Sequence, residues 1–98
     1  MNMKFEWDEN KRILNIQRHQ IDFVGIERVF QGQIITILDD RFDYGEERFI
    51  TFGILNSIVL AIVHTDTDKT IRVISVRKAN KKEEVGYYEN IANQLGKD

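Results

Sequence analysis

The sequence contains no cysteine and no proline among its 98 residues. Without cysteine, the chain can form neither a disulfide framework nor a zinc site built on thiolates. That absence also suits a reducing compartment. Without proline, and without repeats or low-complexity segments, nothing marks a linker between domains. We therefore predict a single domain that spans residues 1–98.

Long hydrophobic runs are also missing. The longest uninterrupted apolar run covers residues 58–63, far short of the ~20 residues that a membrane-spanning helix needs. Residues 1–11 lack the apolar centre of a secretory signal. A composition of 42% hydrophobic residues is typical of a folded globular chain. We expect a soluble, cytoplasmic protein.

Motifs for metal or cofactor chemistry are absent as well. The sequence has no glycine-rich phosphate loop, no His-Glu-x-x-His pair and no nucleophile elbow. His19 and His64 stand far apart in the sequence, without clustered carboxylates. The neighbouring Asp39 and Asp40 fit a solvated turn better than a catalytic carboxylate pair. We predict no metal and no cofactor.

The first third of the chain has helical signals after a short extended piece at residues 4–7. Asp8 is typical of a helix N-cap, and the helix that it opens should run to about His19. Ile13, Leu14 and Ile16 are expected to form its apolar stripe. A second helix is predicted from an N-cap at Asp22 to a stop near Gly32.

The rest of the chain predicts strands and a final helix. Asn80 and Glu83 form a capping-box pattern, and one face of the helix that follows should be lined by Val85, Tyr88, Ile91 or Ala92, and Leu95. The strands are expected at residues 34–38, 48–52, 57–65 and 70–77. Short turns between them imply antiparallel pairing. The predicted fold is α+β: a small antiparallel sheet of about four strands, two N-terminal helices and one C-terminal helix.

Charge is distributed unevenly although the net charge is only −2. Residues 67–82 carry six cations and one anion, a local balance of +5. Residues 39–47 carry five anions and one cation, a balance of −4. A local basic stripe can bind a phosphate backbone even on a slightly acidic chain.

Arg77 is the strongest functional candidate in the basic stripe. It ends a predicted strand and precedes a helix N-terminus, and both a guanidinium and free backbone N–H groups favour anions. The alternative is structural: Arg72 and Arg77 could pair with Glu47, Glu83 or Glu84. Composition alone favours that structural alternative.

Four other residues have both functional and structural interpretations. Arg48 is expected to begin a strand next to that of Arg77, where it could act with Arg77, or it could be an ordinary surface cation. The Tyr87 hydroxyl could face the strand of Arg77, or the ring could simply border the core. His19 ends the first helix, where an imidazolium interacts favourably with the helix dipole. His64 ends an apolar strand, where a hydrogen-bonded core histidine is the simpler interpretation.

Several motifs in combination resemble one family. They are Phe5-Glu6-Trp7-Asp8, Asn10-Lys11, Asn15, His19, Ile21, Phe23, Val29-Phe30, Gly45-Glu46, Arg48, Gly53, Ile71-Arg72-Val73-Ile74-Ser75-Val76-Arg77-Lys78-Ala79, Glu83 and Tyr87. Together they resemble the BrnT family of type II toxins, from about Lys4 to Glu89. The opening tetrapeptide and the block around Arg77 are specific in combination.

The resemblance implies a RelE/ParE-like fold and a ribonuclease that arrests translation without a metal ion. It also implies a BrnA-like antitoxin, through which the complex would bind operator DNA, and no membrane association. Arg77 is expected to stabilise the phosphate, with Arg48, Tyr87, His19 and His64 as further catalytic candidates. The expected RNA-binding residues are Lys69, Arg72, Lys78, Lys81 and Lys82.

Two positions depart from the family pattern. Arg18 stands where many members have lysine, and the turn at residues 65–68 lacks a cation expected near Thr67. Reduced nuclease activity is therefore one expectation. A non-catalytic protein-binding module and a ParE-like gyrase inhibitor are the alternatives.

Overall fold

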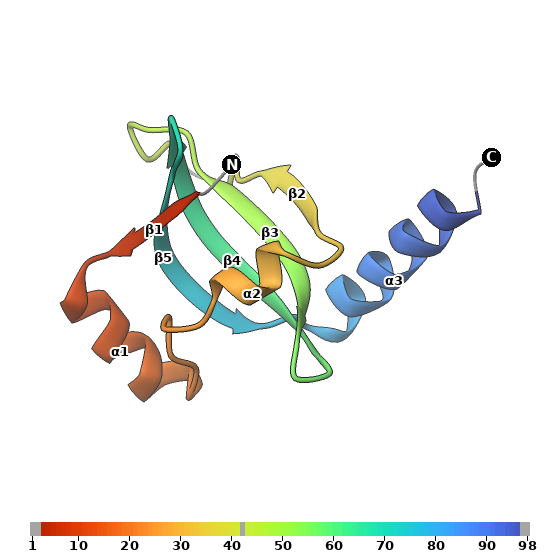
Figure 1. Cartoon of the computed structure of the whole chain (residues 1–98), viewed down its shortest axis with the longest axis horizontal. Coiled ribbons are helices and arrows are strands. Elements are labelled where there is room, and N and C mark those ends of the chain that lie inside the picture. The colour runs from red at the N-terminus through yellow and green to blue at the C-terminus, as the bar shows by residue number, and fades with distance from the viewer. Residues whose placement is uncertain (1–2, 42, 97–98) are drawn as a thin grey trace.

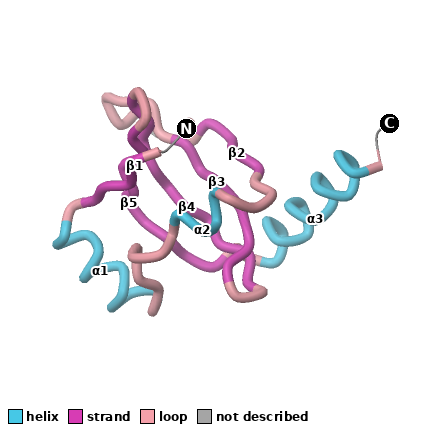
Figure 2. Tube along the Cα trace, viewed as in Figure 1, coloured by secondary structure: helices cyan, strands magenta, loops and turns pink. Residues whose placement is uncertain are grey.

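The computed structural model describes residues 3–41 and 43–96, and its helices and strands are coloured in Figure 2. The elements in chain order are β1 (Lys4–Trp7), α1 (Glu9–His19), α2 (Glu27–Phe30), β2 (Ile35–Leu38), β3 (Phe49–Leu55), β4 (Ile58–Thr67), β5 (Thr70–Lys78) and α3 (Lys81–Leu95). The predicted α+β class is confirmed.

The sheet has five strands in the order β1-β5-β4-β3-β2 (Figure 1). Strands β2 to β5 pair antiparallel, as predicted. The first strand pairs parallel to β5, with Lys4 opposite Thr70 and Trp7 opposite Val73. The prediction of a four-stranded antiparallel sheet was therefore wrong by one strand, since residues 4–7 complete a mixed sheet.

The β3–β4 connection is shorter than predicted, because the turn takes up only Asn56 and Ser57 of the connection expected over residues 53–57. Asn56 and Ser57 both have positive φ, 52° and 68°, which is typical of a two-residue type I′ turn. Gly53, expected in the turn, lies inside β3. A Cβ atom there would stand 2.5 Å from Cγ1 of Val29, so only glycine lets α2 approach the sheet this closely.

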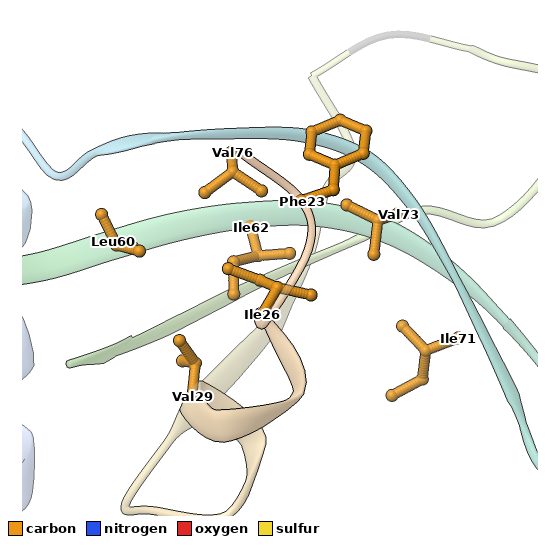
Figure 3. Close-up of a cluster of buried hydrophobic side chains, with 8 residues drawn as sticks. All are labelled: Phe23, Ile26, Val29, Leu60, Ile62, Ile71, Val73 and Val76. Carbon is orange, nitrogen blue, oxygen red and sulfur yellow. The ribbon is translucent and has the colours of Figure 1, made fainter. Parts of the chain in front are cut away.

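The larger apolar cluster lies where the segment around α2 covers one face of the sheet. Figure 3 shows Phe23, Ile26 and Val29 directed toward strand residues that include Ile62 and Val76. The predicted second helix is shorter than expected, because Gly25 has φ 91° and the chain turns there. Only residues 27–30 are helical. The helical spacing of the apolar residues therefore predicted correctly that these residues are buried, but it overestimated the length of the helix.

Helix α1 is attached through a polar side chain. Asp8 caps it as predicted, by accepting hydrogen bonds from the backbone N–H groups of Asn10 and Lys11. The expected apolar stripe is wrong, because Ile13, Leu14 and Ile16 are 36–44% exposed. The one buried residue of α1 is Asn15. Its amide accepts from the N–H of Val76 at 3.0 Å and donates to the Val76 carbonyl at 2.8 Å. This side chain thus occupies the edge of β5 beyond the end of β1.

Helix α3 begins with the predicted capping box between Asn80 and Glu83. Its buried residues are Tyr87 and Ile91, which pack on the second apolar cluster, beside Ile50 and Phe52. The predicted face was correct at Ile91 and wrong at its other positions, since Val85, Tyr88 and Leu95 are 43%, 47% and 69% exposed. The far part of α3 projects away from the sheet (Figure 1).

Candidate functional site

A cavity of about 430 Å³ lies between α3 and the β2–β3 edge of the sheet. Apolar side chains from β2 and β3 line one side of it, and α3 supplies the other side. Charged groups gather at the cavity. The charged side chains that line it are Asp39, Asp40, Arg41, Arg77, Lys82 and Glu83. The cavity thus lies where the end of β5 meets the start of α3.

Arg77 is held by a two-point ion pair with Glu83. Its Nη1 donates to Oε1 at 2.7 Å and its Nη2 donates to Oε2 at 2.9 Å. Nη1 also donates to the Lys78 carbonyl at 3.2 Å. Hydrogen bonding from Arg77 lowers the pKa of the Glu83 carboxyl. The structural alternative weighed for Arg77 is therefore present in the fold.

The ion pair with Glu83 does not use all the N–H donors of the Arg77 guanidinium. Arginine has five N–H donors, and three of those of Arg77 are engaged. The Nε–H and one Nη2–H have no partner among residues 3–41 and 43–96. Glu83 therefore fixes the plane of the guanidinium and leaves donors for an anion. The side chain of Arg77 is 29% exposed, so an anion can reach it.

A second ion pair lies in the loop after β2, where the sequence predicted a solvated turn. Asp39 is only 5% exposed and accepts from Arg41 Nε at 2.7 Å and from the Tyr44 hydroxyl at 3.2 Å. The hydrogen bond from Arg41 lowers the pKa of the Asp39 carboxyl to about 2. Sequence reasoning missed both residues as part of the site. The only signal was the clustering of charge over residues 39–47.

Tyr87 lines the same cavity, but its hydroxyl is engaged. It is 5% exposed and donates to the Gln33 carbonyl at 2.7 Å. Burial raises the pKa of this phenol. Tyr87 therefore joins α3 to the segment before β2, as the core-border interpretation expected.

Arg48 directly precedes β3, which begins at Phe49, and does not line the cavity. Its guanidinium lies 4.0 Å from the centre of the Tyr44 ring, and its Nε is 3.4 Å from Glu46 Oε2. Arg48 therefore stabilises the loop that carries Asp39 and Arg41, and it approaches the cavity only through this loop.

The two histidines lie away from the cavity. His64 is 1% exposed, with Nε2 2.7 Å from Thr51 Oγ1 and Nδ1 2.6 Å from Asp66 Oδ1. Its ring also contacts Phe30, on the face of the sheet that α2 covers. His19 is exposed at the end of α1 and borders two other depressions, of about 490 and 210 Å³. The structure thus brings Arg77 and Tyr87 together and leaves both imidazoles elsewhere.

The cations of the basic stripe separate into two groups. Lys69 and Arg72 lie at the beginning of β5, where Arg72 pairs with Glu6 of β1 at 2.8 Å. Lys78, Lys81 and Lys82 lie at the other end, and Lys82 lines the cavity. Thr67 pairs with Thr70, so the position expected to hold a cation also lies at the end remote from Arg77.

Within residues 3–41 and 43–96, no three histidine, cysteine or carboxylate side chains gather in a way that could hold a metal ion. Within the same residues, no helix is long and apolar enough to cross a membrane.

Comparison with curated proteins gives no match. The sequence does match a family model, described as the ribonuclease toxin BrnT of type II toxin–antitoxin systems, over residues 7–83. The matched segment includes Arg77 and Glu83 and excludes Tyr87. Because this match covers more than half of the sequence, the chain belongs to the BrnT family of ribonuclease toxins.

Proposed function

We propose that this chain is the toxin of a type II toxin–antitoxin pair and that it inhibits translation in the cytoplasm by cleaving RNA. The single observation that carries the proposal is the Arg77–Glu83 pair in the α3 cavity, with two guanidinium N–H groups still free to bind a phosphate. Family membership supports the reaction class.

The proposed chemistry uses side chains in place of a metal ion. Glu83 accepts the proton of a ribose 2′-hydroxyl, whose oxygen then attacks the neighbouring phosphorus. The bond from phosphorus to the 5′-oxygen breaks, which leaves a cyclic phosphate and a 5′-hydroxyl. Arg77 and Lys82 stabilise the charge that builds on the phosphate oxygens. Arginine suits this role because it stays protonated at neutral pH.

The leaving 5′-oxygen needs a proton from an acid. His64 is buried on the far face, and the Tyr87 hydroxyl is bonded to Gln33. His19 also lies away from the α3 cavity, so the 5′-oxygen is proposed to take its proton from solvent water, and none of these three side chains is assigned as the acid. Lys78 and Lys81 are proposed to contact the RNA backbone. Lys69 and Arg72 would contribute only if the RNA extends to the other end of β5, and Arg48 acts by supporting its loop.

The proposed protein partner is a BrnA-like antitoxin. Its segment would cover the cavity and the free cations near Arg77, which would both neutralise and shield them. Binding to operator DNA would then occur through the antitoxin. Type II pairing at the family level supports this arrangement.

The test compares Arg77→Ala with Arg72→Ala in cells. We expect Arg77→Ala to relieve growth arrest at equal abundance, while the folded protein still co-purifies with its antitoxin. Removal of one such cation should raise the barrier by about 2–4 kcal/mol. Arg72→Ala is the matched control, and it should stay toxic because Arg72 pairs with Glu6 away from the cavity. Full toxicity of Arg77→Ala would refute the assignment.

The ion pair also favours a second function, because a guanidinium already bound by a carboxylate can be purely structural. In that case the chain is a non-catalytic binding module. Mapping of RNA ends after brief expression separates the possibilities. New 5′ ends support the nuclease, and growth arrest with intact RNA and a DNA-damage response supports a gyrase inhibitor. If neither new 5′ ends nor a DNA-damage response is found, the result supports the binding module.

A further inference from the structure

We propose that Lys11 and Arg18 of α1, together with the edge of β5 at Ser75, form a binding site for the RNA backbone next to the scissile nucleotide. This inference rests on the proposed function, because it assigns a second contact to the same RNA strand. It concerns a depression of about 210 Å³ between α1 and β5, separate from the α3 cavity.

The attachment of α1 suggests that its exposed face has a role. The helix buries no apolar side chain, and the buried Asn15 fixes it to Val76 of β5 through two hydrogen bonds. Helices on protein surfaces usually bury an apolar stripe. Here the polar attachment instead holds one helical face beside the strand that carries Arg77.

That face carries two cations without partners. Lys11 and Arg18 are exposed, and neither side chain makes a hydrogen bond or ion pair within residues 3–41 and 43–96. By contrast, Arg12 on the same helix is bound by Glu9 and Asp22. Lys11 and Arg18 are seven residues apart, so they share one face of the helix, about 10 Å apart along its axis. No carboxylate lines the depression that they border.

The depression reaches β5 two residues before Arg77. Ser75 lines it together with Leu14 and Ile74, and Ser75 precedes Arg77 by two residues. Alternate residues of a strand point to the same face, about 6–7 Å apart. Ser75 and Arg77 pair with Val63 and Ala61, which both belong to the apolar cluster on the α3 side.

An RNA strand fits this arrangement better than an acidic protein segment does. Lys11, Arg18 and Arg77 offer positive charge at successive places along one path, as a regularly spaced row of phosphates requires. Leu14 and Ile74 provide an apolar floor against which a ribose or base can rest. A strand bound at Arg77 therefore meets these cations at its neighbouring nucleotides.

The experiment measures binding of a short fluorescent 2′-O-methyl oligonucleotide, which cannot be cleaved, over a series of salt concentrations. A single strand loses affinity with a log–log slope of about 0.7 for each phosphate contact. We expect Lys11→Gln and Arg18→Gln each to weaken binding and to reduce the slope by about 0.7, and the double variant by about 1.4.

Two further variants serve as controls. Lys4→Gln removes the same charge from an exposed, unpaired lysine at the start of β1, at the opposite end of β5, and should leave the slope unchanged. The double variant Lys11→Arg/Arg18→Lys keeps both charges and should retain the wild-type slope. A merely structural role of these residues would not produce this pattern.

The outcomes separate this inference from the proposed function. If wild-type protein neither binds the probe nor cuts RNA, both fail. If wild-type protein binds and cuts, but the Lys11→Gln/Arg18→Gln protein keeps the wild-type slope, only this inference fails. If that variant keeps the slope but loses antitoxin binding, the depression is a protein-docking site and the RNA assignment is wrong.

Discussion

The two ends of β5 carry similar residues in different surroundings. At its beginning, Arg72 pairs with Glu6 across β1, and both side chains are about half exposed, 47% and 53%. At its end, Arg77 pairs with Glu83 at 29% and 22% exposure, beside a cavity. Exposed ion pairs contribute roughly 0–1 kcal/mol and interact weakly with anything else. The sequence pattern alone could not distinguish these two arginines, whereas their surroundings do.

The edge of β5 is also closed in two different ways. Strand β1 covers its first half by parallel pairing, from Lys4 to Trp7. Beyond Trp7, the amide of Asn15 takes the place of a strand at Val76. The first half is therefore closed by backbone, and the second half is closed by one side chain. This second arrangement leaves room for the depression beside Ser75.

The largest expected difference between the ends is in activity. Glu83→Gln should reduce RNA cleavage by about 10²–10⁴-fold, because an amide cannot accept the 2′-hydroxyl proton. Glutamine keeps an oxygen that can still accept from Asn80 and Arg77, so α3 should remain capped. Glu6→Gln changes the matching pair at the other end and should leave the cleavage rate unchanged. The measurement is the single-turnover rate on a labelled RNA.

If Glu83→Gln and Glu6→Gln both cleave RNA at the wild-type rate, Glu83 has no part in the mechanism. A matching loss in Glu6→Gln would show instead that any carboxylate beside β5 matters, which would abolish the contrast between the two ends.

The next effect is on stability. Asn15→Leu keeps the size of the side chain but leaves the N–H and C=O of Val76 without their partner. An unsatisfied buried polar group costs about 1–3 kcal/mol, so we expect the free energy of unfolding to fall by about 2–4 kcal/mol. Urea denaturation followed by circular dichroism measures this change. A loss below about 0.5 kcal/mol would show that water replaces the amide and that this edge is not closed by Asn15.

The smallest effect concerns the loop beside the Arg77 end. In the folded chain the pKa of Asp39 lies at about 2, below its ordinary value of 3.8. The Asp39–Arg41 pair therefore contributes its full stabilisation above about pH 4, and this contribution is lost as the pH falls toward 2. Arg41 is 53% exposed, so the contribution should stay below about 1 kcal/mol.

The measurement is the difference in unfolding free energy between wild type and Asp39→Asn. This difference should be present at neutral pH and should shrink as the pH approaches 2. A difference that grows on acidification would have the wrong sign for a lowered pKa.

Local signals in the sequence were sufficient for much of the fold. The N-cap at Asp8, the capping box at Asn80 and three of the strand pairings depend on neighbouring residues, and all were predicted. The pairing of Lys4 with Thr70 was missed, because a four-residue strand has little pattern and its partner is distant in sequence. The length of α2 was overestimated, because Gly25 was not recognised as a turn within a helical pattern.

The candidate site was less predictable, because it depends on how elements pack. Glu83 was considered as a partner of Arg77 and is its partner, but the cavity that they share requires the tilt of α3. Asp39 and Arg41 reach the cavity only through the path of their loop. The burial of Tyr87 in place of Tyr88 follows from that same tilt, which residue periodicity on a single helix cannot specify.

The parallel pairing of β1 with β5 also has a consequence for synthesis of the chain. The first strand must wait for residues 70–73 before it can join the sheet, so the ribosome has made about three quarters of the protein before the sheet can close. Arg77 and Glu83 are made later still. Contacts between such distant residues slow folding. A chain that stops before residue 70 would therefore have neither a complete sheet nor the Arg77–Glu83 pair.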